Sequence, residues 1–114
     1  MYNILTLNNI SKVGTNLLKN NYICSSDTLN PDAILLRSQP MHDFKLNENL
    51  LAIVRLGAGT NNIPIEKCSK NGTVVFNTPG ANANAVKELV ISSLISSSRK
   101  IFPSISWLQS ISTK

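Results

Sequence analysis

The sequence is poor in aromatic residues, histidine and cysteine, and it lacks any long apolar run. Aromatic side chains make up 5% of the 114 residues, and His42 is the only histidine. Cys24 and Cys68 are far apart and lack the spacing of metal ligands, so we expect two reduced, mostly buried thiols in a cytosolic protein. No apolar stretch is long enough to cross a bilayer, and residues 1–4 carry no basic leader. We therefore expect a cytoplasmic protein without a membrane partner.

Charge is also scarce, and the positive charge is not concentrated anywhere. Eleven Lys and Arg residues against six Asp and Glu residues give a formal net charge of +5. The basic residues are scattered, and the only adjacent pair is Arg99-Lys100. A nucleic-acid binder usually gathers its charge on one face, with aromatic residues interleaved. Dispersed charge favours a small anionic ligand over nucleic acid, although a basic nucleic-acid-binding domain stays open as a third possibility.

Short apolar runs alternate with helical patterns along most of the chain. Because the runs are apolar on both faces, they favour an α/β fold whose parallel sheet, flavodoxin-like or Rossmann-like, is covered by helices on each side. The predicted strands are residues 2–7, 22–24, 33–36, 50–54 and 73–76, and the predicted helices are residues 10–20, 64–70 and 82–101.

Particular residues set the ends of the predicted helices. Pro64 suits the first turn of its helix, where a missing N–H costs nothing, and Asn71-Gly72 ends that helix in the left-handed conformation. The pair Phe102-Pro103 is predicted to end the last helix. One side of that helix is apolar and the other is rich in serine, which indicates either a second domain or subunit packed closely against it or a solvated face.

Three polar segments follow directly on predicted strands: residues 36–39, 55–62 and 77–82. In open α/β sheets, ligands bind at the carboxyl edge, where the strands end and loops with free backbone N–H groups begin. The sequence therefore predicts a ligand cleft along this edge.

The first two segments carry groups that suit an anion. Arg37 and Ser38 offer a bidentate guanidinium and a hydroxyl, although a surface arginine at a strand end is common. Gly57 and Gly59 let the backbone bring N–H groups close to a carboxylate or phosphate, unless they form an ordinary turn. Arg55 is expected to be partly buried and to tie strand or helix ends together.

The remaining polar candidates are less specific. Asn82 is able to donate to a ligand or to cap the next helix, which is the commoner duty of Asn at such a place. His42 follows Gln39-Pro40-Met41 in a loop, and we expect it to be exposed rather than catalytic. No nucleophile with a paired base, no pair of carboxylates and no metal cluster emerges, so the sequence offers binding groups without catalytic residues.

Taken together, the segments resemble the D-isomer-specific 2-hydroxyacid dehydrogenase family. "LLRSQP" at residues 35–40 resembles the family's strand-end Arg-Ser. Residues 54–91, "VRLGAGTNNIPIEKCSKNGTVVFNTPGANANAVKELVI", resemble its glycine loop, the following helix and strand, and the entry of the next helix. The likeness is closest to members that oxidise D-3-phosphoglycerate. It implies an NAD-dependent oxidoreductase of a D-2-hydroxy acid, converting 3-phosphoglycerate to 3-phosphohydroxypyruvate in serine biosynthesis.

The resemblance also implies roles for individual residues. Arg37 and Ser38 would bind the phosphate end of the substrate, and Arg55 would support the loop or contact the phosphate indirectly. The backbone of Gly57-Ala58-Gly59 would hold the substrate carboxylate, and Asn82 would line the cleft.

Two departures from the family pattern bear on these roles. Asn61 stands where the family commonly has Asp, which weakens the expected anchoring of the loop. Gln39-Pro40 stands where the family more usually continues with small or basic residues after Arg-Ser. The resemblance therefore implies family membership more directly than it implies specificity for a phosphate.

The resemblance further divides the chain and leaves part of the enzyme outside it. Residues 1–101 would form the main part of a substrate-binding domain, incomplete at its C-terminus, and residues 102–114 would begin the connecting helix to an NAD-binding domain. That domain would carry the catalytic arginine, glutamate and histidine, so we expect these 114 residues alone to be inactive and the intact protein to be a homo-oligomer. The alternative is a free-standing anion-binding or interaction module without catalysis.

Overall fold

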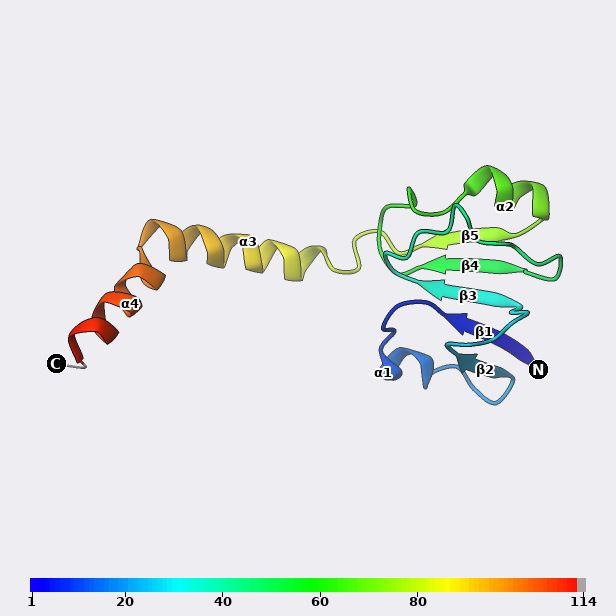
Figure 1. Ribbon diagram of the computed structural model, residues 1–114, viewed down its shortest axis with the longest axis horizontal. Helices are drawn as coiled ribbons and strands as arrows, with labels where there is room; N and C mark the ends of the chain where they lie inside the picture. Colours follow the sequence, from blue (N-terminus) through cyan, green and yellow to red (C-terminus); the bar gives the residue numbers. More distant parts are fainter. Residues whose placement is uncertain (113–114) are drawn as a thin grey trace. The chain divides into compact units, whose positions relative to one another are not determined.

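The computed structural model describes residues 1–112, in which a five-stranded sheet is followed by two helices (Figure 1). All strand pairs are parallel, in the order β2-β1-β3-β4-β5, which confirms the α/β fold. The elements are β1 (Tyr2–Thr6), α1 (Lys12–Thr15), β2 (Tyr22–Ser25), β3 (Ala33–Leu36), β4 (Ala52–Arg55), α2 (Ile65–Asn71), β5 (Val74–Asn77), α3 (Ala83–Ser98) and α4 (Ile101–Ser112).

The chain divides into two compact units, which we call the sheet unit and the helical unit. The sheet unit is Met1–Pro79, and the helical unit begins at Gly80 and contains α3 and α4. The division into domains at residues 101 and 102 stays a prediction.

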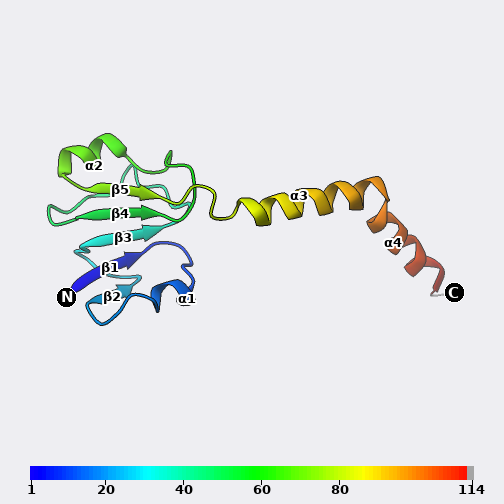
Figure 2. The ribbon, with the colours of Figure 1, turned by 180° about the vertical axis from the view of Figure 1, so that it is seen from behind.

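The strand order places a change of direction at β1. From β1 the chain passes outward to β2, then returns beyond β1 to β3 and continues through β4 to β5 (Figure 2). The connections on the two sides of β1 therefore run in opposite directions, so loops diverge at the carboxyl ends of β1 and β3. In doubly wound sheets this point is where ligands bind.

The core of the sheet unit lies on one face of the sheet. Leu5, Ile34, Ile53 and Val75 are register partners in a single row across β1, β3, β4 and β5. Ile34 and Ile53 are fully buried. Around this row pack Leu36, Met41, Leu50, Ile63 and Cys68, which come from strand ends, loops and α2.

The opposite face of the sheet is less well covered. Val74 and Phe76 of β5 point away from the core row, because side chains alternate along a strand, and they are 53% and 54% exposed. Within residues 1–79, the expected cover of helices on both faces is therefore not found over β5.

The first helix is much shorter than the predicted residues 10–20. Only Lys12–Thr15 is helical, and none of these residues is buried. Gly14 weakens the segment, and Val13 and Leu17 are 78% and 77% exposed, so no packing compensates.

The second helix and its ends match the prediction closely. α2 begins one residue after Pro64 and ends before Gly72, whose φ of 75° lies in the left-handed region. The Gly72 N–H donates to the carbonyl of Ser69 at 3.2 Å, and this bond closes the helix.

The helix predicted over residues 82–101 is α3, which ends at Ser98, so Phe102-Pro103 does not end it. α3 stops at Ser98 after a run of serines, which are weaker helix formers than Ala or Leu, and Lys100 adopts a left-handed φ of 52°. Pro103 instead lies in the first turn of α4, where its lacking N–H breaks no helical bond. Within residues 1–112, no helix is both long and apolar enough to span a bilayer.

Candidate anion-binding site at the carboxyl edge

The loops after β3 and β4 leave the sheet side by side. Leu36 and Arg55 are register partners at the ends of these strands. The N–H of Leu56 donates to the carbonyl of Leu36 at 2.8 Å, so pairing continues one residue into the loop. The structure thus brings Arg37 and the Gly57–Gly59 turn to one edge, as the sequence predicts.

Arg55 links these two loops through its side chain. Its Nε donates to the carbonyl of Arg37 at 3.1 Å, and Arg55 is only partly exposed, as predicted. A Cβ placed on Gly57 would lie 1.8 Å from Nη1 of Arg55. The guanidinium therefore occupies the space that any larger residue at 57 would need, which is the physical reason for glycine there.

The glycine turn is anchored on its far side by the loop after β5. Asn77 Nδ2 donates to the carbonyl of Ala58 at 2.8 Å, and the N–H of Thr78 donates to the carbonyl of Gly57 at 3.0 Å. The N–H of Gly57 itself donates to the carbonyl of Arg55 at 2.9 Å. Within the described chain only Ala58 and Gly59 keep unpaired N–H groups in this turn, so these two are the ones available to an anion.

The electrostatics of this edge are set by two arginines without acidic partners. Among the described residues, neither Arg37 nor Arg55 forms an ion pair, and Arg37 is exposed. Ser38, also exposed, makes no hydrogen bond to any residue within 1–112. The unpaired guanidinium of Arg37, the free hydroxyl of Ser38 and the Arg55 guanidinium, whose Nε bonds to the backbone of Arg37, together form a cationic donor set suited to phosphate or carboxylate.

Two asparagines that sequence reasoning did not assign to the site hold the Arg37–Gln39 segment in place. Asn8 Oδ1 accepts from the N–H groups of Arg37 and Gln39, at 3.0 and 3.1 Å. Asn62 Nδ2 donates to the carbonyls of the same two residues, at 3.2 and 2.8 Å. The signal available for Asn8 was its place at the end of the first strand, where Asn tolerates a left-handed backbone. The sequence holds no comparable signal for Asn62.

Asn82 lies in the helical unit, directly before α3. Its side chain does not cap the helix, and its backbone carbonyl accepts from the N–H of Val86 at 3.1 Å. Its role in the cleft stays a prediction.

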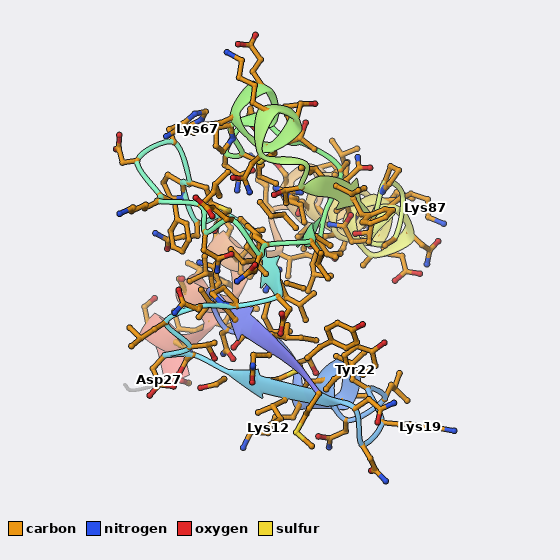
Figure 3. The ribbon with its side chains drawn as sticks, turned by 90° about the vertical axis from the view of Figure 1, so that its right-hand side faces the viewer. Lys12, Lys19, Tyr22, Asp27, Lys67 and Lys87 are labelled. Atoms are coloured by element: carbon orange, nitrogen blue, oxygen red, sulfur yellow. The ribbon has the colours of Figure 1, made fainter. Side chains whose placement is uncertain are left out.

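His42 is exposed and engaged in loop contacts. Its Nε2 lies 2.9 Å from the carbonyl oxygen of Asn61, and Lys67 Nζ donates to the carbonyl of His42 at 3.1 Å. These residues line a hollow of about 620 Å³ beside α2, on which Figure 3 labels Lys67. No carboxylate within residues 1–112 hydrogen-bonds to the imidazole, so no acid–base pair is formed around it.

The described residues do not form a metal site. Within residues 1–112, no group of three or more His, Cys, Asp or Glu side chains is placed to hold a metal ion.

Comparison with known proteins identifies the class to which this fold and edge belong. Residues 5–113 match the model of the D-isomer specific 2-hydroxyacid dehydrogenase catalytic domain. The chain therefore belongs to this family, an oxidoreductase family, as the resemblance indicated.

Individual relatives show which members are similar. The chain is 37% identical over 73 residues to D-3-phosphoglycerate dehydrogenase of Archaeoglobus fulgidus, covering 61% of this chain and 14% of that protein. It is 41% identical over 58 residues to hydroxypyruvate reductase of Thermotoga maritima, covering 51% and 19%. A third relative is D-3-phosphoglycerate dehydrogenase 1 of Saccharomyces cerevisiae, 37% identical over 54 residues, covering 47% and 12%. The chain thus matches less than a fifth of the length of each of these proteins.

Proposed function

We propose that this chain is the substrate-binding part of an NAD-dependent dehydrogenase that oxidises D-3-phosphoglycerate to 3-phosphohydroxypyruvate, the reaction implied for serine biosynthesis in the cytoplasm. The observation that carries the proposal is the pair of arginines, Arg37 and Arg55, which share one edge and have no acidic partner within the described chain. Family membership supplies the reaction class, and the relatives named for phosphoglycerate favour a phosphorylated substrate.

The site offers two kinds of donor for a substrate with two anionic ends. Arg37 and Ser38 would bind the phosphate, whose oxygens suit a bidentate guanidinium and a hydroxyl. The free N–H groups of Ala58 and Gly59 would bind the carboxylate. Held at both ends, the acid would present its C2 hydroxyl in a fixed orientation, which is what this chain contributes to catalysis.

The cofactor and the proton-transferring groups lie outside this donor set in our proposal. Family membership implies an NAD-binding domain, and in our proposal NAD would be bound by that part of the intact enzyme. Without that part we expect this chain to bind substrate but not to turn it over.

The proposal is tested by removing the guanidinium of Arg37 in the intact protein. Arg37→Ala should raise the KM for D-3-phosphoglycerate about tenfold or more, because a charge-assisted phosphate contact is lost, and should affect D-glycerate much less. Lys19→Ala is the control, since it removes one positive charge just before the start of β2, where Figure 3 labels Lys19 near Tyr22.

The outcome separates three cases. Equal effects on both acids would argue against a phosphate role for Arg37. Phosphoglycerate binding without turnover in the intact protein would favour the alternative of a binding module. No affinity for either acid would overturn the proposed function.

We further propose that the intact protein is a homo-oligomer in which α3 and α4 are covered. No residue of either helix is buried, and their large apolar side chains are between 39% and 70% exposed. A surface of this kind usually marks an interaction site. A monomeric mass in light scattering would contradict this.

A further inference from the structure

We propose that Asn8 and Asn62 are positioning residues that together clamp the Arg37–Gln39 segment and so present Arg37 and Ser38 to the ligand. This inference rests on the proposed function for the identity of the ligand, but the clamp itself rests on contacts within the sheet unit.

The clamp uses every backbone polar group of the two outer residues of the segment. Asn8 Oδ1 accepts from the N–H groups of Arg37 and Gln39, and Asn62 Nδ2 donates to their carbonyls, all between 2.8 and 3.2 Å. Ser38, between them, pairs with no described residue. The middle residue is thus held by its neighbours while its own N–H and hydroxyl stay free.

The partners allow only one orientation of each carboxamide. Two N–H groups face the oxygen of Asn8, and two carbonyls face the nitrogen of Asn62, so turning either group over would oppose like atoms. The two side chains are therefore not interchangeable: position 8 requires an acceptor and position 62 requires a donor.

Both asparagines hold their positions at an energetic cost. Asn8 has a φ of 70°, a left-handed conformation that is uncommon for residues other than glycine. Asn62 Oδ1 is buried without a hydrogen-bond partner within the described chain, which is unfavourable for a polar atom. A strained backbone or an unpaired buried polar atom at the carboxyl edge of the sheet, where ligands bind, indicates that the residue serves function rather than stability alone.

The clamp also joins three loops at the point where the sheet changes direction. Leu7 donates to the carbonyl of Leu35 at 2.8 Å, which carries β1 alongside β3 up to Asn8. Asn62 follows the glycine turn after β4, and its carbonyl accepts from the N–H of Met41 at 2.8 Å. The Arg37–Gln39 segment is therefore fixed from both neighbouring strands' loops.

Three isosteric variants, each of which adds one negative charge, distinguish the effect of losing the clamp on ligand affinity from the effect of that charge. Asn8→Asp keeps an acceptor, Asn62→Asp loses both donors and opposes two carbonyls, and Asn61→Asp adds the same charge in the loop without touching the clamp. We expect the Kd of the full-length protein for D-3-phosphoglycerate to be about tenfold higher in Asn62→Asp than in Asn61→Asp. Asn8→Asp should stay within about twofold of Asn61→Asp.

A second measurement needs no ligand. In amide hydrogen exchange of the full-length protein, Arg37 and Gln39 should exchange more slowly than Ser38, because only their N–H groups are bonded. Asn8→Ala should abolish the difference and Asn8→Asp should retain it. This comparison also keeps the inference testable if Asn62→Asp fails to fold.

The outcomes distinguish this inference from the proposed function. Equal Kd values in the three Asp variants would overturn the positioning role. Equal exchange of residues 37, 38 and 39 in the wild type would overturn the clamp. If the wild type does not bind phosphoglycerate at all, the proposed function fails, and the exchange pattern alone then decides whether the clamp exists.

Discussion

The sheet unit and the helical unit contain similar apolar side chains but differ in whether those side chains are buried. In the sheet unit, Ile34, Leu36 and Ile53 are fully buried under α2 and the surrounding loops. In α3 and α4 no residue is buried, and Leu94 is 66% exposed. The comparison teaches that an apolar helical pattern specifies a helix, whereas burial requires a second layer of structure to pack against it.

The largest expected difference is in thiol reactivity. Burial raises the pKa of the Cys68 thiol, which is 0% exposed, so little reactive thiolate forms at neutral pH. We expect Cys68 to react with a thiol reagent about a thousandfold more slowly than Cys24, because labelling requires the core to open.

A Leu94→Cys variant extends the same measurement to the helical unit. In these 114 residues alone the new thiol should react as fast as that of Cys24, since Leu94 is exposed. In the intact homo-oligomer that we propose, α3 is covered and the same thiol should react slowly. Slow labelling at position 94 in the 114 residues alone would break the comparison.

Truncating one leucine in each unit gives the next largest effect. Leu36→Ala should lower the free energy of unfolding by about 3 kcal/mol, because it opens a cavity in the core. Leu94→Ala should change it by about 0.5 kcal/mol or less, because the side chain is already in solvent. Urea denaturation followed by circular dichroism measures both, and similar losses would mean that α3 packs as tightly as the sheet.

Gly57→Ala tests whether ligand affinity and stability of the sheet unit depend on different residues. The added Cβ would displace the guanidinium of Arg55, the flexible end of a side chain, and the φ of 157° at Gly57 adds backbone strain, so we expect some loss of stability as well. Affinity for D-3-phosphoglycerate should fall about tenfold, since the guanidinium and the loop move together. Gly72→Ala, which carries backbone strain in the same unit but whose Cβ would meet nothing within 4 Å, is the control, measured by calorimetric titration and thermal melting. Equal effects of the two substitutions would contradict the role given to Gly57.

The smallest expected effect compares two left-handed glycines. Gly72 and Gly80 have φ values of 75° and 81°, and both have open space around them. Gly72→Ala should destabilise the sheet unit by about 1 kcal/mol through backbone strain. Gly80→Ala carries the same strain just outside that unit and should leave its denaturation midpoint unchanged. A shift of that midpoint in Gly80→Ala would show that the two units unfold together.

The sequence by itself was enough to predict the alternation of strands and helices, because apolar runs bounded by turn residues leave few other arrangements. It also placed Arg37 and the Gly57–Gly59 turn at one edge, since strands of a parallel sheet end on the same side. The left-handed end of α2 at Gly72 followed from the conformational freedom of glycine.

Only the tertiary structure decided where local patterns fail and how the edge is held together. The first helix shrank to Lys12–Thr15 because its apolar residues found nothing to pack against. The helix predicted over residues 82–101 ended at Ser98, before the left-handed Lys100, a residue without turn chemistry. The bonds of Asn8 and Asn62 to Arg37 and Gln39 span 23 to 31 residues. Such contacts arise when separate strands come together, and no local propensity specifies them.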